Sequence, residues 1–509
     1  MSRIHRASRD GIIAASLVTL VAACSGPRVV TTPPPVPTAA ATPAAPATID
    51  LTKPPTLGAP PPLTPPQIST RELPNGLKIV VLEHHELPLV DVMLQVRSGG
   101  ESDPSSKTGT ASLVSALLTE GTANRTALQI ADQAAFLGIQ LNASSGWEQS
   151  TVSLHTPTAQ LDSALALFSD VALRPSFPAP DLERVRKIRL TALQQLRDRA
   201  PAIADRAFAT AVFGAQHPYG RPLAGTEGSI ASISRDDVQR FYTTYYRPNN
   251  ATLLVVGDVR PDDVERRARE LFGTWTRGTV PTAPTATPSG AKGTRVVIVD
   301  KPDAEQTSFR VGGIGAPRST SDYFPLQVMN TILGGAFSSR LNLNLREEHG
   351  YTYGAFSSFD MRLLAGPFSA GAGVQTDKTS ESLQEFFKEL NGMLEPVPAD
   401  ELARAKNYVS LRFPAGFETT GDISRRLEEV LVYGLPDDYF SRYVQNIEAV
   451  AAADVQRVAK QYLAPDRVAV VVVGDRGTIE PGIRTLNLGP IIPIAIDDLF
   501  GGPAGPAAR

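Results

Sequence analysis

The chain has 509 residues, a formal net charge of −3, 42% hydrophobic residues and 20% charged residues. This length allows two or more domains with their own cores, and the composition is that of a globular protein. Lys and Arg form no basic patch interleaved with aromatic side chains, which excludes nucleic acid as a predicted partner. The single cysteine, Cys24, excludes an intramolecular disulfide.

The first 23 residues have the pattern of an export signal. Three arginines precede an apolar stretch, residues 11–23, that is too short to span a bilayer as a permanent helix. It ends Leu-Val-Ala-Ala-Cys at Cys24, which resembles a bacterial lipoprotein signal with a lipidated cysteine. Ser25 follows, and the absence of Asp there favours the outer membrane in enteric-type bacteria. We expect a lipid-anchored envelope protein facing the periplasm; an ordinary secretory peptide or an uncleaved anchor is the alternative.

Residues 24–66 are rich in Pro, Ala and Thr and show no hydrophobic periodicity. Such a composition forms neither a helix nor a paired strand, because proline lacks the backbone N–H and fixes φ. We predict a disordered, extended tether between the lipid and the globular part of the chain.

A globular pattern begins near residue 67. The sequence predicts strands over 78–82, 89–96 and near 150–155, helices near 109–120, 126–137, 160–172, 181–197 and 261–272, and a strand ending at Gly257-Asp258.

The same pattern then repeats. After a second Pro/Thr/Ala segment, Val296 aligns with Ile79 and Gly474 aligns with Gly257, at one constant offset. The irregular order of strands and helices favours an α+β fold made of two homologous mixed α/β domains. We predict an N-terminal domain over 67–278, a linker over 279–294, a C-terminal domain over 295–478 and a C-terminal arm over 479–509.

The stretch 333–353, LGGAFSSRLNLNLREEHGYTY, carries the strongest local pattern. It predicts a turn at Gly334–Gly335, a helix with Ser338 or Ser339 as N-cap, and a stop at Gly350. Arg346 lies in the last turn of that helix, and Tyr353 follows seven residues later. Both side chains donate hydrogen bonds and suit a peptide carbonyl; the alternative is a surface arginine and a tyrosine packed on a strand.

This stretch resembles the Arg/Tyr segment of zinc peptidases of the pitrilysin/insulinase family, which includes the mitochondrial processing peptidases. Further matches are His217-Pro-Tyr-Gly220 and Tyr246-Arg-Pro-Asn-Asn250, so the resemblance covers most of the globular chain. It implies two related domains that close like a clam shell around an extended peptide. It also implies that Arg346 and Tyr353, beside Gly334 and Gly335, contact bound substrate.

Family members that cut peptides carry His-x-x-Glu-His, in which two His ligands hold Zn²⁺ and the Glu activates water. The matching helix runs from Gly109 to Gly121-Thr122, and its ends fix the register. The zinc-motif positions are then occupied by Ser112, Ser115 and Ala116, and the downstream glutamate by Gln194 or Gln195. Hydroxyls, a methyl and amides are poor zinc ligands.

No other catalytic pattern replaces this motif. The six histidines form no His-x-x-x-His or Cys/His set, and Ser338 and Ser339 lack a Gly-x-Ser-x-Gly context. We therefore predict that this chain binds no cofactor and has no catalytic residue of its own.

Two-chain members of the family divide the labour between a zinc subunit and a non-catalytic subunit. The resemblance implies that this chain is the non-catalytic, substrate-binding subunit, inactive alone. Its partner would be a homologous subunit with His-x-x-Glu-His and zinc, in a heterodimer or larger assembly, and its substrate a peptide. The alternatives are an inert scaffold or peptide-binding protein of the envelope, and a self-sufficient metallopeptidase.

Overall fold

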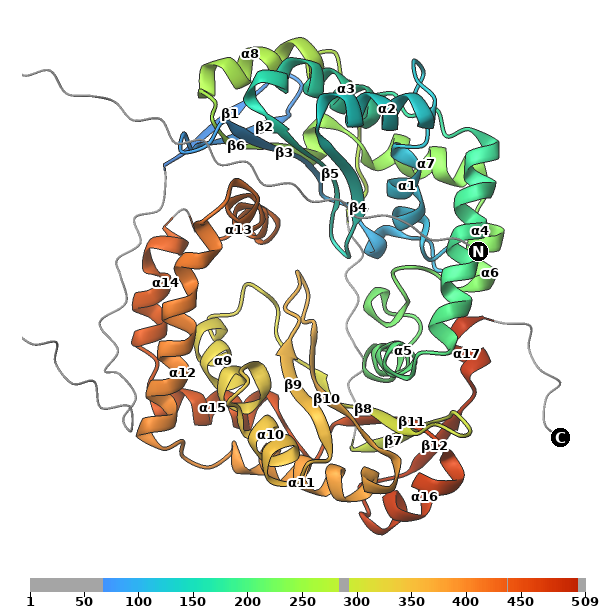
Figure 1. The fold of residues 1–509 in the computed structure, drawn as a ribbon, viewed down its shortest axis with the longest axis vertical. Helices are drawn as coiled ribbons and strands as arrows, with labels where there is room; N and C mark the ends of the chain where they lie inside the picture. Colours follow the sequence, from blue (N-terminus) through green and yellow to red (C-terminus); the bar gives the residue numbers. More distant parts are fainter. Residues whose placement is uncertain (1–66, 283–292, 437, 502–509) are drawn as a thin grey trace, which may run out of the picture. The chain divides into compact units, whose positions relative to one another are not determined.

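The computed structural model describes residues 67–282, 293–436 and 438–501 (Figure 1). The predicted signal peptide, the predicted tether and Cys24 lie outside the described residues, as does most of the predicted linker. Within the described part, no helix combines the length and apolar character that crossing a membrane requires.

The N-terminal half is built on a six-stranded mixed sheet with the order β1-β2-β6-β3-β5-β4. Its strands are β1 (Ile68–Glu72), β2 (Lys78–Glu83), β3 (Leu89–Val96), β4 (Gln140–Ser145), β5 (Ser150–Pro157) and β6 (Ala251–Gly257). Its helices are α1 (Thr110–Leu118), α2 (Ala127–Leu137), α3 (Leu161–Leu173), α4 (Ala179–Arg197), α5 (Ala200–Phe213), α6 (Glu227–Ser232), α7 (Arg235–Tyr245) and α8 (Pro261–Phe272).

The C-terminal half has a second six-stranded sheet with the order β12-β7-β11-β8-β10-β9. Its strands are β7 (Arg295–Asp300), β8 (Gln306–Ile314), β9 (Thr352–Phe359), β10 (Pro367–Gln375), β11 (Ala469–Gly474) and β12 (Ile491–Ile494). Its helices are α9 (Tyr323–Asn330), α10 (Arg340–Asn342), α11 (Thr379–Gly392), α12 (Ala399–Arg412), α13 (Thr420–Tyr433), α14 (Tyr439–Glu448), α15 (Ala452–Tyr462), α16 (Arg476–Thr485) and α17 (Ile496–Phe500).

The strand registers of the two sheets confirm the duplication. In the parallel pair β2–β6, Ile79 lies opposite Leu253; in the parallel pair β7–β11, Val296 lies opposite Val470. Val296 follows Ile79 in the sequence by the same number of residues as Val470 follows Leu253. The antiparallel neighbours of β6 and β11 follow the same rule. The predicted α+β class, with two homologous mixed sheets carrying helices, is therefore confirmed.

Helix α5 belongs to the N-terminal half but packs on the sheet of the C-terminal half (Figure 1). Its side chains Ile203 and Phe208 share a buried cluster with Val297 of β7 and Val471 of β11. Beside this apolar contact, Asp205 of α5 accepts a hydrogen bond from the buried Arg310 of β8 at 2.7 Å. The helix therefore covers a sheet face that would otherwise be exposed.

Helix α13 makes the reciprocal contact with the N-terminal sheet. Ile423 and Leu427 lie in one buried cluster with Val80 of β2 and Leu254 of β6. Every residue of β6 and of β11 is buried. Strands covered on both faces have continuous apolar runs rather than alternation, which explains Leu-Leu-Val-Val in β6 and Val-Val-Val-Val in β11.

The segment after Asp475 differs from the expected C-terminal arm. Helix α16 packs against α11, and β12 pairs in parallel with β7 at the edge of the C-terminal sheet. Helix α17 then contacts α4 and α5 of the N-terminal half, with Phe500 fully buried there. This segment is part of the folded body because its apolar residues, spaced too irregularly to predict an element, fill the end of the α5 cluster.

We expect Leu427→Ala to destabilise the whole protein, because Leu427 is 2% exposed and joins α13 to the N-terminal sheet. The free energy of unfolding should fall by about 2–5 kcal/mol, measured by urea denaturation of the full chain. Leu128→Ala, at a residue 69% exposed on α2, is the control and should change it by less than about 0.5 kcal/mol. Equal urea midpoints for both variants would contradict the view that packing of α13 on the N-terminal sheet stabilises the protein.

Candidate functional site

The N-terminus of α1 is fixed by a side-chain cap. The Asp103 carboxylate accepts hydrogen bonds from the backbone N–H of Gly109 at 2.6 Å and of Ala111 at 2.8 Å. Gly109 has φ of +91°, and a Cβ there would lie 2.9 Å from the Cα of Gly225. A glycine is therefore required at the start of this helix.

The residues at the zinc-motif positions are small and face different surroundings. Ser115 is 1% exposed and lies in the core beside the Tyr246 hydroxyl. Ser112 is half-buried, and its Oγ accepts a hydrogen bond from Nη1 of Arg189 at 2.8 Å. Ala116 offers only a methyl group to the same half-buried surface.

Gln194 and Gln195, predicted to replace the third ligand, lie on the exposed surface of α4. The α4 residue that reaches the motif is Arg189, which sequence reasoning missed. It lies four residues after the buried Val185 and four before the buried Leu193, hence on the inward face of α4. That spacing was the available signal.

The donors at these positions do not fit zinc. A serine hydroxyl, a methyl group and a guanidinium supply neither imidazole nor carboxylate, and the guanidinium is itself a cation. Elsewhere in the described residues, no group of three or more His, Cys, Asp or Glu side chains is arranged to hold a metal ion.

Arg346 lies in a π-helical segment, Leu343–Glu348, that continues α10. Its guanidinium carbon stands 4.4 Å from the ring centre of Phe337, and its Nε is 3.5 Å from Oε1 of Glu347. Tyr353 lies on β9, the edge strand of the C-terminal sheet, and is 90% exposed. Within the described part of the chain these two side chains share no hydrogen bond; Arg346 is half-buried against Phe337 and Glu347, whereas Tyr353 is exposed.

Gly334 and Gly335 end a second π-helical segment, Thr331–Gly335, that continues α9 rather than forming the expected isolated turn. A Cβ on Gly334 would collide with the backbone nitrogen of Ser357 on β9. Glycine at this position therefore allows the helical segment to lie directly against β9, the strand that carries Tyr353.

Asn342 fixes the position of β9, a role that no sequence pattern indicated. Its Nδ2 donates to the Ala355 carbonyl at 2.7 Å, and its Oδ1 accepts from the Ala355 N–H at 3.0 Å. The amide thus pairs with β9 as a neighbouring strand would, which also protects part of this sheet edge.

The motif His217-Pro-Tyr-Gly220 forms a joint between the two halves. The buried Tyr219 hydroxyl donates to Glu148 and accepts from the backbone N–H of Leu364 at 3.3 Å. The Arg362 guanidinium carbon lies 4.6 Å from the ring centre of Trp147 and 4.5 Å from that of Tyr219. His217 accepts from the Tyr219 N–H, so this histidine has a structural role.

Two buried carboxyl groups lie beside this joint. Glu101 and Glu148 line a cavity of about 510 Å³ together with Arg97 and, from the C-terminal half, Leu363. Burial, reinforced by the charge of Glu148, raises the pKa of Glu101 to about 8. Burial also raises the pKa of Glu148, against the hydrogen bond from Tyr219 that lowers it.

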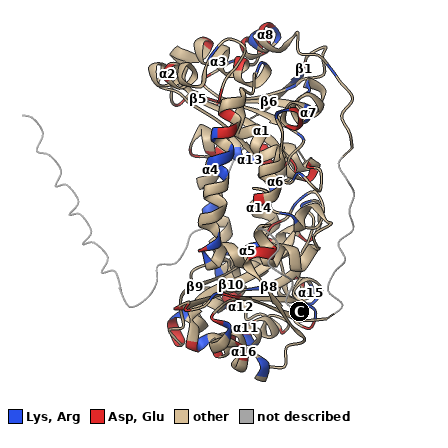
Figure 2. Cartoon of the chain, turned by 90° about the vertical axis from the view of Figure 1, so that its right-hand side faces the viewer, with Lys and Arg blue, Asp and Glu red and all other residues tan. Residues whose placement is uncertain are grey.

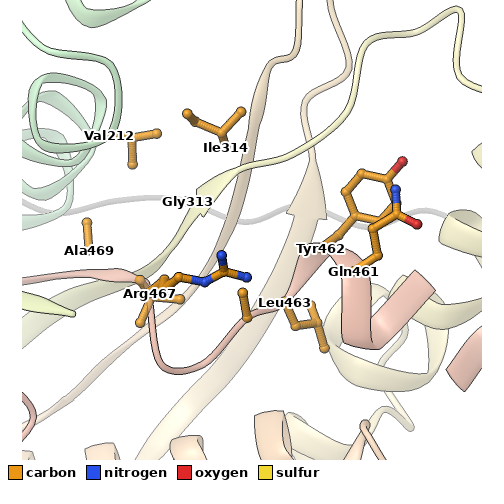
Figure 3. A pocket seen from close by; sticks show the side chains of 10 residues that line it. Val212, Gly313, Ile314, Gln461, Tyr462, Leu463, Arg467 and Ala469 are labelled. Carbon is orange, nitrogen blue, oxygen red and sulfur yellow. The ribbon is translucent and has the colours of Figure 1, made fainter. Parts of the chain in front are cut away.

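A separate cavity of about 180 Å³ lies between α5, β8 and the loop that follows α15, and Figure 3 shows the side chains that line it. Val212, Ile314, Tyr462 and Arg467 are among its lining residues. None of the sequence-predicted site residues lines this cavity, so we do not assign the site to it.

Two family models match the chain. Residues 79–227 match the model described as Insulinase (Peptidase family M16), and residues 232–409 match the Peptidase M16 inactive domain. An uncharacterized zinc protease of Mycobacterium leprae is 30% identical over 399 residues, or 77% of this chain and 88% of that protein. A probable mitochondrial-processing peptidase subunit beta of Arabidopsis thaliana is 23% identical over 427 residues, or 81% and 79%.

Solved structures share the fold. The peptidase M16 inactive domain from Pseudomonas fluorescens superposes with a TM-score of 0.75 at 26% identity, covering 80% of this chain and 98% of that one. A protease from Helicobacter pylori also gives a TM-score of 0.75, over 80% and 99% of the chains. Its 22% identity shows the fold alone.

Stability should fall as pH rises, because the pKa of Glu101 is about 8 in the folded chain against an ordinary value of 4.5. Between these values the unfolded carboxyl is ionised while the folded one is protonated, so unfolding releases a proton. The free energy of unfolding then decreases by up to about 1.4 kcal/mol per pH unit from this group, and the decrease ends above the folded pKa.

Glu101→Gln should remove this part of the slope, so the variant gains stability over the wild type from pH 5.5 to pH 8.5 in urea titrations. The exposed Glu86→Gln is the control and should keep the wild-type slope. Parallel slopes for wild type and Glu101→Gln would show that Glu101 ionises normally in the folded chain.

Proposed function

This chain belongs to the insulinase family (peptidase M16), and we propose that it is the non-catalytic, substrate-binding subunit of a two-chain zinc peptidase. The observation that carries the proposal is the contrast between the two predicted sites. At the zinc-motif positions the hydroxyl of Ser112 accepts a hydrogen bond from the guanidinium of Arg189. In the Arg/Tyr segment, Tyr353 is exposed, and Arg346 contacts only the exposed side chains of Phe337 and Glu347 among its polar and ring partners in the described residues, which a bound peptide can displace.

Two comparisons support a partner. The model that matches residues 232–409 is described as an inactive domain, and one relative is named as a subunit of a processing peptidase. We propose a homologous partner that carries His-x-x-Glu-His and zinc, in a heterodimer or larger assembly. The partner's zinc supplies the activation of water, and this chain supplies contacts to the peptide.

The role of Arg346 and Tyr353 follows from their chemistry. The Arg346 guanidinium and the Tyr353 hydroxyl each donate hydrogen bonds to a peptide carbonyl oxygen. Asn342 and the close contact of Gly334 fix the backbone of β9, which carries Tyr353, so this strand needs little reorganisation when the carbonyl gains negative charge. Arg346 and Tyr353 orient the peptide and stabilise that charge at the partner's site.

The proposed location rests on the first 24 residues. A lipid on Cys24 anchors the protein in the bacterial cell envelope, on the outer membrane facing the periplasm.

Purification from the native cells in mild detergent should yield a companion of similar size with His-x-x-Glu-His. Metal analysis should find stoichiometric zinc in the pair and none in the isolated chain, because Ser112, Ala116 and Arg189 are not zinc ligands. Stoichiometric zinc with peptidase activity in the isolated chain would instead identify a self-sufficient metallopeptidase.

Arg346→Ala should reduce peptide hydrolysis by the purified pair by about 10²-fold without lowering thermal stability, since the ring and ion-pair contacts of Arg346 within the described residues are those with the exposed Phe337 and Glu347. Tyr353→Phe, which removes one hydroxyl, should cost about tenfold. Arg404→Ala, at an exposed arginine paired with Asp400, is the matched control and should leave hydrolysis unchanged. Wild-type hydrolysis by Arg346→Ala would reject the proposal in favour of an inert scaffold.

A further inference from the structure

Helices α1 and α4 bring a hydroxyl and a guanidinium together where the family's cutting members hold zinc. Ser112 stands at the first histidine position of the motif, and Nη1 of Arg189 donates to its Oγ at 2.8 Å. The site therefore contains one fixed positive charge, although it has lost every group that could hold a metal cation.

No carboxylate in the described part of the chain neutralises this charge. Helix α1, Thr-Ala-Ser-Leu-Val-Ser-Ala-Leu-Leu, has no ionisable side chain. Glu120, which follows α1, is bound by Arg184, and this arginine also holds Asp181. Glu183 of α4 pairs with Arg186. Arg189 thus has a neutral oxygen as its hydrogen-bond partner and no ion pair.

The Arg189 guanidinium is half-buried, and burial lowers its pKa. It stays protonated at neutral pH because the ordinary pKa of arginine is so high. None of its nitrogens is enclosed without a partner, so the N–H groups that do not bond Ser112 remain accessible. Figure 2 shows Lys and Arg residues along this helix, α4. A partly desolvated cation with free N–H donors has the chemistry to bind an anion.

Of the common anions, a carboxylate fits this site best if the ligand is a peptide. The fork of a guanidinium matches the two oxygens of a carboxylate. Strand β4, the edge strand of the N-terminal sheet, packs against α1, the helix that carries Ser112, so a peptide that adds to this edge runs close to that helix. We infer that Arg189 and Ser112 bind a carboxylate of the bound peptide, from either its C-terminus or an acidic side chain. This inference rests on the proposed function.

Peptide binding to the purified full chain, without a partner, tests the inference. Fluorescence anisotropy would compare three pools of fluorescein-labelled decapeptides with otherwise neutral, randomised residues: free acids, C-terminal amides, and amides with one internal Glu. The wild-type chain should bind at least one carboxylate-bearing pool about tenfold more tightly than the neutral amides. Tight binding of the free acids alone identifies the C-terminal carboxylate, and equal binding of the Glu pool identifies an acidic side chain.

Arg189→Gln should bind all three pools with the affinity of the neutral amides. Arg189→Lys keeps the positive charge but lacks the paired N–H donors of a guanidinium. Its affinity for the carboxylate-bearing pools should lie between those of the wild type and Arg189→Gln. Lys187→Gln removes the same charge from an exposed residue two positions away and should behave as wild type. Unchanged selectivity in Arg189→Gln, or equal loss in Lys187→Gln, would overturn the inference.

Arg346→Ala in the same assay separates the two proposals. If it weakens binding of every pool while Arg189→Gln keeps its preference for carboxylates, the substrate-binding role stands and the carboxylate site does not. If the wild-type chain binds no pool, both fail.

Discussion

The structure depends on a reciprocal contact in which each half of the chain contributes one helix that covers the sheet of the other half. Helix α5 covers β7, β8 and β11, and α13 covers β3 and β6, so the central strands are buried on both faces. Each sheet alone would expose an apolar face several strands wide, which water disfavours in proportion to area. Two duplicated halves therefore stabilise each other, and a hydrogen bond from the half-buried Gln149 to Glu428 of α13 fixes their contact.

The framework around the helix at the zinc-motif positions is well ordered by local contacts. Asp103 caps α1, and Gly109 permits its close approach to Gly225. A metal ion and a guanidinium both attract oxygen anions, but a guanidinium cannot bind water as a ligand or make it a nucleophile. Arg189 beside Ser112 thus supplies positive charge without the chemistry of a metal ion.

Elements with a strong local pattern were predicted well. Strand β3 spans the predicted residues 89–96, and α2 and α8 begin and end within a residue of the prediction. Strand β4 was missed because its Gln-Leu-Asn-Ala-Ser-Ser sequence lacks the β-branched residues that mark strands. The contacts of helices α5 and α13 could not be predicted for a different reason: their apolar faces resemble those of any amphipathic helix, and no local pattern indicates which sheet each helix covers.

The sequence by itself determined the duplication, the two sheet-forming repeats, the absence of zinc ligands at residues 112, 115 and 116, and the candidate pair Arg346 and Tyr353. These follow from residue identity and spacing, which need no knowledge of distant contacts. Only the tertiary structure decided the exchange of α5 and α13, the pairing of Asn342 with β9, and the contact of Arg189 with Ser112. Each contact joins separate segments of the chain, and the residues of one segment do not indicate which other segment they contact. Packing between elements depends on the whole fold rather than on local pattern.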